Sequence, residues 1–409
     1  MASTREDRRT SDDFRYDVCV VGGCGHVGLP LAITFADRGF EVSIYDINER
    51  SIAMVRAGKM PFLEPGAEPK LREVIGRKLE VANDPKLVSR SRCVVVVIGT
   101  PVDEHLNPTF HAMRRFIAGL LPHMADGQCL VLRSTVYPGT TEKVRELVAA
   151  SGKEIAVAFC PERVAEGKAM EELTELPQIV SGCDERAIRM ACELFGRIAK
   201  SIIRLSPLEA ELTKIFANVW RYIQFATANQ FFMVATDYGL DFYRIFDALT
   251  RDYPRMAGLP KSGFAAGPCL FKDTMQLAAA TNNTFALGHA AMLINEGLPN
   301  FIVRHLKARY PLATMTVGIL GMAFKADSDD PRESLCYKLR KVLEYEAGEV
   351  LCTDVYIQDP AFFPLEEVIE RADLLIVGVP HREYRTLQFP GPKPVIDIWN
   401  TYGKGTALS

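Results

Sequence analysis

Through the first half of the chain, short runs of apolar residues alternate with longer stretches whose apolar residues recur every three or four positions. The short runs have the length and the Val/Ile content of buried strands, and the longer stretches have the periodicity of amphipathic helices. Strands are therefore predicted at residues 17–21, 41–45, 93–98, 128–132 and 154–159. Strands that alternate with helices in this way form a parallel sheet with crossover helices.

The pattern changes at residue 208. Residues 208–238 contain no proline or glycine and carry apolar residues at helical spacing, so they predict one long helix that ends at Gly239. Further helical segments continue to about residue 310, with breaks at the Gly/Pro-rich segments 256–260 and 263–268.

After residue 311 the alternation of strands and helices returns. Strands are predicted at residues 316–320, 349–354, 373–378 and 394–398. The predicted fold class is α/β, with an N-terminal Rossmann-like parallel sheet, a central helical domain and a smaller C-terminal Rossmann-like α/β domain. The corresponding boundaries are a disordered tail at 1–15 and domains at 16–205, 206–310 and 311–409.

The composition is that of an ordinary globular protein, with 48% hydrophobic and 24% charged residues and a formal net charge of −3. This balance gives no reason to expect a nucleic-acid partner or an anionic membrane surface. The first 15 residues lack the apolar stretch of a secretory signal, and the apolar runs elsewhere are shorter than the ~20 residues of a membrane helix.

The ten cysteines are scattered and show no zinc-site spacing. Cys19, Cys93 and Cys129 fall inside predicted strands, where a free thiol packs as a small apolar side chain. A chain of this size does not need disulfides. We therefore expect reduced thiols, a cytoplasmic protein and no structural metal.

A glycine-rich turn with the spacing GxGxxG follows the first predicted strand at residues 23–28. In this context the first glycine allows a tight turn, the second lets the backbone approach a pyrophosphate, and the third lets the helix pack closely on the strand. The next strand ends at Asp46, whose carboxylate can accept both ribose hydroxyls and would repel a 2′-phosphate, so NAD is favoured over NADP. The alternative is a purely structural glycine turn. The residues of the turn predicted to contact the cofactor are Gly23, Gly25, His26, Val27 and Gly28.

A second candidate site is the small-residue loop that leads into Cys269. A cysteine after such a loop can lie at a helix N-terminus, where its thiol pKa falls below the usual ~8.5 and more thiolate is present. Asp273 is four positions later and would lie on the same helix face one turn on. A lone cysteine is more often a packing residue, so this loop is not decisive by itself.

Polar residues at helical spacing on the long predicted helix form a third candidate. Glu211, Lys214 and Asn218 share one face, where a lysine and an asparagine can stabilise an oxyanion or relay a proton. The alternative is a solvated polar stripe.

Glu162 and Glu166, in the segment that directly follows the fifth predicted strand, form a fourth candidate. A carboxylate at the carboxyl end of a strand can activate water at the ligand edge of the sheet, although surface acids are common. Thr100 and Pro101 follow one strand, and Ser134 and Thr135 follow another, so we expect these residues at the cofactor edge as well.

Taken together, these residues resemble the UDP-glucose/GDP-mannose (nucleotide-sugar) dehydrogenase family over residues 16–402. The resemblance implies NAD as cofactor and a four-electron oxidation of a sugar C6 hydroxyl to a carboxylate in polysaccharide biosynthesis. It implies that Cys269 attacks the intermediate aldehyde and carries a thioester, that Glu162 acts as acid/base in its hydrolysis, and that Lys214, Asn218 and Asp273 assist the first oxidation. Thr135 belongs to the same catalytic set. The matching motifs are GxGxxG with Asp46, Gly99-Thr100-Pro101, residues 134–141, Pro161-Glu162 with Glu166-Gly167, Lys214 with Asn218, Cys269 with Asp273, and residues 321–325 with 329–334.

The family resemblance also implies a UDP-sugar substrate held by the C-terminal domain, and a homodimer or larger homo-oligomer built on the long helix. It implies NAD binding by domain 16–205 and UDP binding by domain 311–409. The implied substrate-binding residues are Glu162, Glu166, Lys214, Asn218, Arg255, Lys261, Gly263, Phe264, Gly267, Phe324, Lys325 and Arg332.

The loop before Cys269 departs from the family pattern. It reads Gly-Phe-Ala-Ala-Gly-Pro-Cys instead of Gly-Phe-Gly-Gly-x-Cys, which narrows the freedom of the backbone. Residues 161–164 are closer to the N-acetylhexosamine branch, whereas residues 269–273 are closer to the UDP-glucose branch. From the sequence we expect UDP-glucose as the substrate, with UDP-N-acetylglucosamine and UDP-N-acetylmannosamine as alternatives. A two-electron β-hydroxyacid-type dehydrogenase and a non-catalytic NAD-binding sensor are the rival functions.

Overall fold

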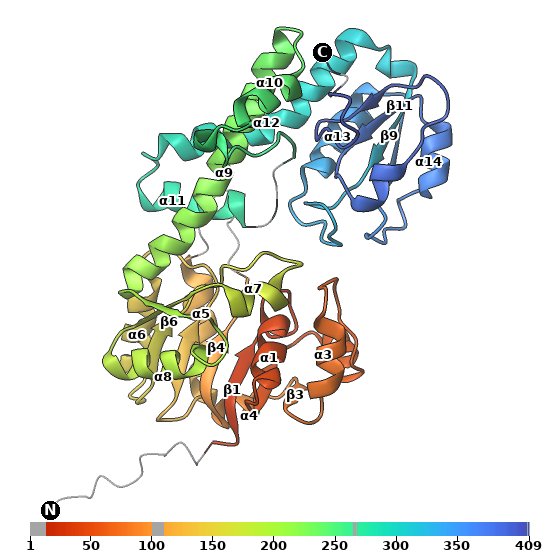
Figure 1. Cartoon of the computed structure of the whole chain (residues 1–409). Coiled ribbons are helices and arrows are strands. Elements are labelled where there is room, and N and C mark those ends of the chain that lie inside the picture. The colour runs from red at the N-terminus through yellow and green to blue at the C-terminus, as the bar shows by residue number, and fades with distance from the viewer. Residues whose placement is uncertain (1–13, 100–109, 265–266, 268, 407, 409) are drawn as a thin grey trace, which may run out of the picture. The chain divides into compact units, whose positions relative to one another are not determined.

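The computed structural model describes residues 14–99, 110–264, 267, 269–406 and 408. The chain forms two compact units, residues 1–216 and 217–409 (Figure 1). Each unit contains one sheet, and helix α9 (Pro207–Asp237) begins in the first unit and continues into the second. No helix of the described part has both the length and the apolar content to cross a membrane.

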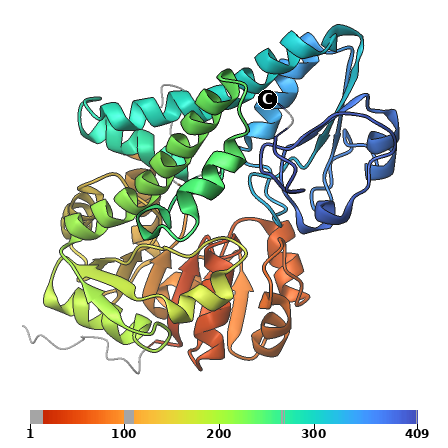
Figure 2. The same cartoon turned by 45° about the horizontal axis from the view of Figure 1, so that its top comes forward.

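The first unit contains an eight-stranded sheet with the order β3-β2-β1-β4-β5-β6-β7-β8. Figure 2 shows this unit in red to yellow-green. All neighbouring strands are parallel except β6 and β7. The chain leaves β1 for β2 on one side and later returns to β4 on the other, so the carboxyl ends of these strands form a topological switch point. The strands are β1 (Tyr16–Val21), β2 (Val42–Tyr45), β3 (Leu79–Ala82), β4 (Ser91–Val96), β5 (Cys129–Leu132), β6 (Ala156–Phe159), β7 (Gln178–Gly182) and β8 (Ile202–Arg204).

Helices cover both faces of this sheet. Successive side chains of each strand point to opposite faces, and both faces are apolar, so each face must be buried by helices. Val18 and Val20 of β1 are buried in one core, and Cys19 and Val21 are buried in another. The helices are α1 (Gly28–Asp37), α2 (Glu49–Arg56), α3 (Ala67–Val74), α4 (Lys86–Ser89), α5 (Phe110–Leu120), α6 (Thr140–Ala150), α7 (Ala169–Glu175) and α8 (Glu185–Phe195).

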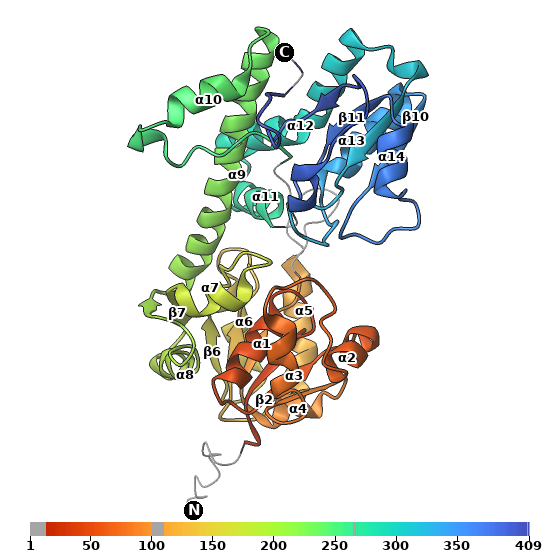
Figure 3. The same ribbon diagram turned by 45° about the vertical axis from the view of Figure 1, so that its right-hand side comes forward.

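The second unit begins with a helical region. Residues of α9, α11 (Leu270–Ala280) and α12 (Ala286–Arg309) pack together around Tyr222, Ala226, Leu270 and Ala291 (Figure 3). Helix α10 (Phe242–Thr250) follows α9 after Gly239, whose φ of 68° provides the left-handed residue that ends a helix.

A four-stranded parallel sheet completes the second unit, with the order β10-β9-β11-β12. This order repeats that of β2-β1-β4-β5 in the first unit. Helices α13 and α14 lie on opposite faces, since Val317 and Ile319 share a core with α13 and Leu320 shares one with α14 (Figure 1). The elements are β9 (Thr316–Leu320), α13 (Leu335–Glu346), β10 (Glu349–Thr353), α14 (Leu365–Arg371), β11 (Leu374–Val377) and β12 (Val395–Ile396).

The predicted fold class is confirmed, and each predicted strand corresponds to an observed one within a few residues. The prediction missed β3, β7 and β8 and with them the antiparallel pairing of β6 and β7. All ten cysteines lie in the described part of the chain, none of them is in a disulfide there, and only Cys269 among them is exposed. The predicted division into a tail and three domains stays a prediction, and most of the predicted tail falls outside the described residues.

Candidate functional site

The glycine turn joins β1 to α1, as the spacing predicts, but the roles of the individual glycines differ from those predicted. The left-handed residue is Gly22, with φ of 75°, and not Gly23. A Cβ on Gly23 would lie 2.8 Å from Val20 O, and one on Gly28 would lie 2.6 Å from the Cα of Gly23, so both are needed for close packing. A Cβ on Gly25 would meet only Gly22 O, at 3.9 Å. The open side of the turn is therefore at Gly25, beside the N-terminus of α1, where a pyrophosphate would fit.

Asp46 ties this turn to the end of β2. Its Oδ2 accepts the N–H of Cys24 at 2.9 Å and its Oδ1 accepts the N–H of Asn48 at 2.9 Å. An ionised carboxylate has about four acceptor positions, so each oxygen keeps capacity for a ribose hydroxyl. The carboxylate is half-buried, and Arg50, in the first turn of α2, is exposed. The arrangement fits NAD in the first unit.

His26 points from the glycine turn toward the segment after β6. Its Nδ1 lies 3.0 Å from Oε1 of Glu166, and its ring centroid lies 4.0 Å from that of Phe62. Val27 precedes the first helical residue and is partly exposed. Two sequence-predicted residues, His26 and Glu166, are thus brought together, and Phe62 was missed because nothing local in the sequence links residue 62 to the turn.

Ser134 and Thr135 follow β5 at the same edge of the sheet. The Ser134 hydroxyl donates to Ile98 O at 2.6 Å and so joins the ends of β4 and β5. Thr135 is half-buried beside it. The predicted Thr100 and Pro101 lie outside the described residues.

Both carboxylate oxygens of Glu162 accept hydrogen bonds from the protein. Its Oε2 forms an ion pair with Arg133, and its Oε1 accepts the N–H groups of Arg163 and Val164 at 2.7 and 2.9 Å. Arg133 is fully buried and also donates to Cys160 O at 3.1 Å. Sequence reasoning missed Arg133, although a charged residue directly after an apolar strand is a usable signal that a buried partner exists.

Glu64 is a second residue that the sequence did not reveal. It is 5% exposed, and its two oxygens accept the N–H groups of Gly167 and Ala169 at 2.9 and 2.8 Å. These donors lie at the end of the Glu162–Gly167 segment and at the start of α7, where unpaired N–H groups need an acceptor. Glu64 therefore fixes the far end of the segment that carries Glu166.

The face predicted on the long helix exists, but its three residues have different partners. Glu211 accepts the N–H groups of Gly139 and Thr141 at 2.6 and 2.7 Å and thereby caps α6. Burial raises the pKa of Glu211 even though these hydrogen bonds act in the opposite direction. Lys214 is half-buried one turn later on α9, and Asn218 follows after a further turn.

Asn218 and Asp273 are brought together in the second unit. The Asn218 Nδ2 donates to Asp273 Oδ2 at 2.6 Å, and Lys272 Nζ lies 2.7 Å from Asp273 Oδ1. Asp273 is fully buried and Asn218 is 6% exposed. The two predicted catalytic residues thus form one polar group between α9 and α11.

Cys269 is exposed and immediately precedes Leu270, the first residue of α11. Its carbonyl accepts the N–H of Asp273 at 3.0 Å, which is the first turn of the helix. The thiol is therefore at a helix N-terminus, as the sequence predicts, with the Asn218–Asp273 pair one turn away. The partial positive charge of a helix N-terminus favours thiolate.

Phe264, Gly263 and Gly267, in the loop before Cys269, are packed against other side chains of the second unit. Phe264 is 3% exposed and packs in the core of the second unit, so only its backbone is available to a substrate. Gly263 and Gly267 have φ of 154° and 117° and lie against the rings of Trp399 and Phe324. Lys261 Nζ lies 3.4 Å from Trp399 O, and Arg255 is exposed beside Tyr253.

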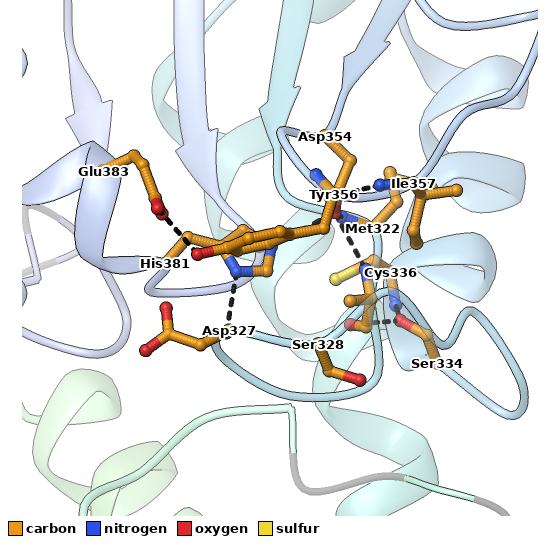
Figure 4. A network of polar contacts seen from close by, with 12 residues as sticks. Met322, Asp327, Ser328, Ser334, Cys336, Asp354, Tyr356, Ile357, His381 and Glu383 are labelled. Carbon is orange, nitrogen blue, oxygen red and sulfur yellow. Dashed lines mark hydrogen bonds and ion pairs between the residues drawn. The ribbon is translucent and has the colours of Figure 1, made fainter. Parts of the chain in front are cut away.

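The sheet of the second unit has its own glycine turn after β9, at Gly321, with φ of 93°. Asp354, after β10, accepts the N–H groups of Met322 and Ala323 at 2.7 and 3.1 Å (Figure 4). His381 is fully buried; its Nδ1 accepts the N–H of Asp327 at 2.9 Å, so its Nε2 is the donor toward Asp354, at 3.2 Å. Burial opposes ionisation of Asp354, but the hydrogen bonds from His381 and from the backbone hold its pKa below the ordinary value.

The basic residues predicted for the nucleotide lie directly after this turn. Lys325 Nζ lies 5.5 Å from the ring centroid of Phe324, and both side chains are half-buried. Arg332 donates to Asp330 through Nε at 2.8 Å, within its own loop. Arg332 is therefore partly neutralised by a neighbouring carboxylate.

Two Rossmann-like sheets, with a cofactor-type glycine turn in the first and a helical segment between them in the sequence, are typical of NAD-dependent dehydrogenases. Family models for the three domains of the UDP-glucose/GDP-mannose dehydrogenase family match the chain: the NAD binding domain at residues 16–199, the central domain at 208–297 and the UDP binding domain at 318–404. The chain belongs to this family, so it is an NAD-dependent nucleotide-sugar 6-dehydrogenase.

Similar proteins cover nearly the whole chain. A UDP-N-acetyl-D-mannosamine dehydrogenase of Pyrococcus horikoshii is 30% identical over 379 residues, which are 90% of each chain. A solved structure of the UDP-D-ManNAc dehydrogenase from Pyrococcus horikoshii has a TM-score of 0.88 at 29% identity and covers 95% of this chain and 96% of that one. A UDP-glucose dehydrogenase structure from Pyrobaculum islandicum has a TM-score of 0.84 at 27% identity and covers 96% of each chain.

Proposed function

We propose that this chain oxidises the C6 hydroxyl of a UDP-N-acetylhexosamine to a carboxylate, with UDP-N-acetylmannosamine as the first substrate to test. The exposed thiol of Cys269 at the start of α11, one turn from the Asn218–Asp273 pair, is the observation that carries the reaction type. The 30% identical relative named for UDP-N-acetylmannosamine, together with the Pro161–Val164 segment, supports the sugar. UDP-glucose, preferred from the sequence, becomes the second substrate, and UDP-N-acetylglucosamine the third.

NAD is held in this proposal by the open side of the glycine turn and by Asp46. Gly25 leaves room for the pyrophosphate, and the two oxygens of Asp46 accept the ribose hydroxyls. Gly23, His26, Val27 and Gly28 shape the turn, and Ser134 and Thr135 lie at the same edge. Thr100 and Pro101 stay cofactor-binding candidates from the sequence. When bound there, NAD would supply the hydride acceptor for each of the two oxidations.

In the first oxidation the sugar hydroxyl loses its proton to a water held near Lys214 and Asp273. The Asn218 amide orients the Asp273 carboxylate, since the two are joined at 2.6 Å. Lys214 and Asn218 stabilise the negative charge that develops on the sugar oxygen.

In the second oxidation the Cys269 thiolate adds to the aldehyde carbon and forms a thiohemiacetal. Loss of hydride from that carbon leaves a thioester, and attack by water releases the carboxylate and the free thiol. All partners of Glu162 donate hydrogen bonds to it, which suits a carboxylate that orients the attacking water as a base. Glu166 lies on the same segment and contributes to substrate binding.

The nucleotide of the substrate is assigned to the C-terminal domain, residues 311–409, with NAD in 16–205 and the helical domain at 206–310. Lys325 neutralises the diphosphate, and Phe324 lies beside it. Arg332, Arg255 and Lys261 supply further positive charge, and Gly263, Phe264 and Gly267 offer their backbone to the sugar.

We also infer a homodimer formed through α9. Phe216 and Trp220 are 52% and 61% exposed on this helix, and Phe231 and Val234 are 44% and 46% exposed. Large apolar side chains in such a row along one helix mark a surface that a partner covers.

A panel of UDP-sugars tests the proposal, with NADH counted per sugar consumed. Two NADH per UDP-N-acetylmannosamine is the expected result. One NADH per sugar would favour the two-electron β-hydroxyacid-type dehydrogenase. Binding of NAD without reduction by any of the three UDP-sugars would favour a non-catalytic sensor.

A further inference from the structure

The backbone of Gly263, at the start of the loop that leads to Cys269, is bracketed by one buried side chain. The N–H of Gly263 donates to Asn229 Oδ1 at 2.9 Å, and Asn229 Nδ2 donates to Gly263 O at 3.0 Å. Asn229 is a fully buried residue of α9. One amide therefore satisfies both backbone groups of this glycine, which fixes its position and orientation.

A second buried amide fixes the first. Asn229 Nδ2 also donates to Asn295 Oδ1 at 2.9 Å, and Asn295 Nδ2 donates to Tyr222 O at 3.2 Å. Asn295 is fully buried on α12. If either amide rotated by 180°, its oxygen would face another oxygen and its NH2 group would lose its acceptor. A buried polar group without a partner is costly, so the orientation of both amides is fixed.

The opposite side of Gly263 is closed by the ring of Trp399. A Cβ on Gly263 would lie 2.3 to 2.5 Å from three carbons of this ring, so no other residue fits at position 263 without a shift. The ring is itself anchored, since Trp399 Nε1 donates to Gly378 O at 2.9 Å. The Ser262 and Tyr243 hydroxyls both donate to Ile398 O, at 3.0 and 2.7 Å, and join the loop to the strand end beside Trp399.

The other glycine of the loop has the same kind of neighbour. A Cβ on Gly267 would lie 2.7 Å from Cδ2 of Phe324, which follows β9. Both aromatic residues come from the carboxyl edge of the C-terminal sheet, Phe324 after β9 and Trp399 after β12. Both positions are glycine in this sequence, and Ala265 and Ala266 stand between them.

We infer that Asn229, Asn295 and Trp399 are positioning residues for the Cys269 nucleophile, and that they fix its loop to the edge of the nucleotide-binding sheet. This inference rests on the proposed role of Cys269. It explains why a small-residue loop can hold a reactive thiol in register with a sugar whose nucleotide is bound by that sheet. A misplacement of about 1 Å in a reacting group costs on the order of 100-fold in rate.

Gly263→Ala tests the inference, with Gly297→Ala on α12 as the matched control because a Cβ there meets nothing within 4 Å. We expect Gly263→Ala to lower kcat about 100-fold with KM for the UDP-sugar changed less than about threefold, and Gly297→Ala to leave both unchanged. A Gly263→Ala enzyme with the same kcat as the control would overturn the inference.

Alkylation by iodoacetamide gives a readout that does not depend on turnover. Cys269 is the only exposed cysteine among the ten, so its modification can be followed by mass, with Cys269→Ser as the blank. Trp399→Phe leaves a gap beneath Gly263 with less risk to folding, and we expect it to change the alkylation rate about threefold or more at an unchanged Tm. An unchanged rate in this variant would also overturn the inference. If the wild type reduced no NAD with any UDP-sugar, the proposed function would fail while the alkylation result still stood.

Discussion

Asp46 and Asp354 occupy equivalent places in the two sheets of this chain. Each follows the strand next to the first strand of its sheet, and each accepts backbone N–H groups from the glycine turn after that first strand. The two carboxylates differ in how many hydrogen bonds they can still accept from a ligand. Asp46 accepts two N–H groups, whereas Asp354 accepts those of Met322, Ala323, Tyr356 and Ile357 as well as the His381 side chain. The first turn is open to a dinucleotide, and the second carboxylate is saturated by the protein.

Asp46→Asn is therefore expected to weaken NAD binding, and Asp354→Asn is the matched control. Loss of hydrogen bonds to a charged acceptor costs about 1.5–3 kcal/mol, so the KM for NAD should rise roughly 10- to 100-fold in Asp46→Asn. The discrimination against NADP should fall as well, because the negative charge facing the 2′ position is gone. Steady-state kinetics with both cofactors measure this. An unchanged KM for NAD in Asp46→Asn, or an equal rise in Asp354→Asn, would contradict the assignment.

The low pKa of Asp354 predicts an acid-sensitive C-terminal sheet. Its folded pKa lies below the unfolded value of about 3.9, so between the two values the unfolded chain binds more protons and stability rises with pH. The stabilisation is present above about pH 4 and is lost as the pH falls through the folded pKa. Urea unfolding as a function of pH should show this slope, and Asp354→Asn should flatten it. A slope of the same size in the variant would assign the acid sensitivity to other groups.

Much of this architecture could be predicted because its signals are local. The alternation of apolar runs, the glycine spacing before α1, the acid after β2 and the proline-free stretch of α9 each lie within one segment. The three missed strands gave weak signals: β8 has only three residues, two of them exposed, and β7 ends in Ser181-Gly182. A short, half-polar run does not stand out from a loop.

The contacts that organise the site could not be predicted because they join residues far apart in sequence. Arg133 reaches Glu162 across 29 positions, Glu64 reaches Gly167 across 103, and Asn229 reaches Gly263 across 34. Each of these residues is ordinary in its own segment, and its role appears only when the sheet and helices bring its partner close. Single-sequence reasoning therefore found the residues that carry chemistry and missed most of those that hold them.

Cys269→Ser is expected to stop the reaction before the acid is formed. A serine hydroxyl is far less nucleophilic than a thiolate, so the aldehyde should not pass to a thioester. With UDP-N-acetylmannosamine, NADH formation should fall to at most one per sugar, and steady turnover should be lost. Cys192→Ser, at a half-exposed cysteine of the first unit, is the control and should keep two NADH per sugar. Continued turnover of Cys269→Ser would indicate a two-electron enzyme.

Glu162→Ala is expected to destabilise the first unit as well as slow hydrolysis. It leaves the fully buried guanidinium of Arg133 without its carboxylate, and such a loss costs about 3–5 kcal/mol. Glu166→Ala is the comparison and should cost less, because the side chains of His26 and Glu166 are 23% and 17% exposed whereas that of Arg133 is fully buried. Urea denaturation gives both values. Equal stability of the two variants would show that the Arg133–Glu162 pair is not a structural anchor.

The exposed apolar face of α9 predicts that one substitution at its surface will separate the dimer. Trp220 is 61% exposed on α9, and replacing it with glutamate places a charge where the proposed partner packs. A buried, unpaired charge at an interface core costs several kcal/mol, so Trp220→Glu should shift the protein from dimer to monomer at micromolar concentration. Tyr345→Glu is the matched control, since Tyr345 on α13 is 88% exposed and belongs to another helix. Sedimentation velocity distinguishes the species. A monomeric wild type would show that there is no such interface. An unchanged dimer in Trp220→Glu, together with dissociation of Tyr345→Glu, would place the interface elsewhere.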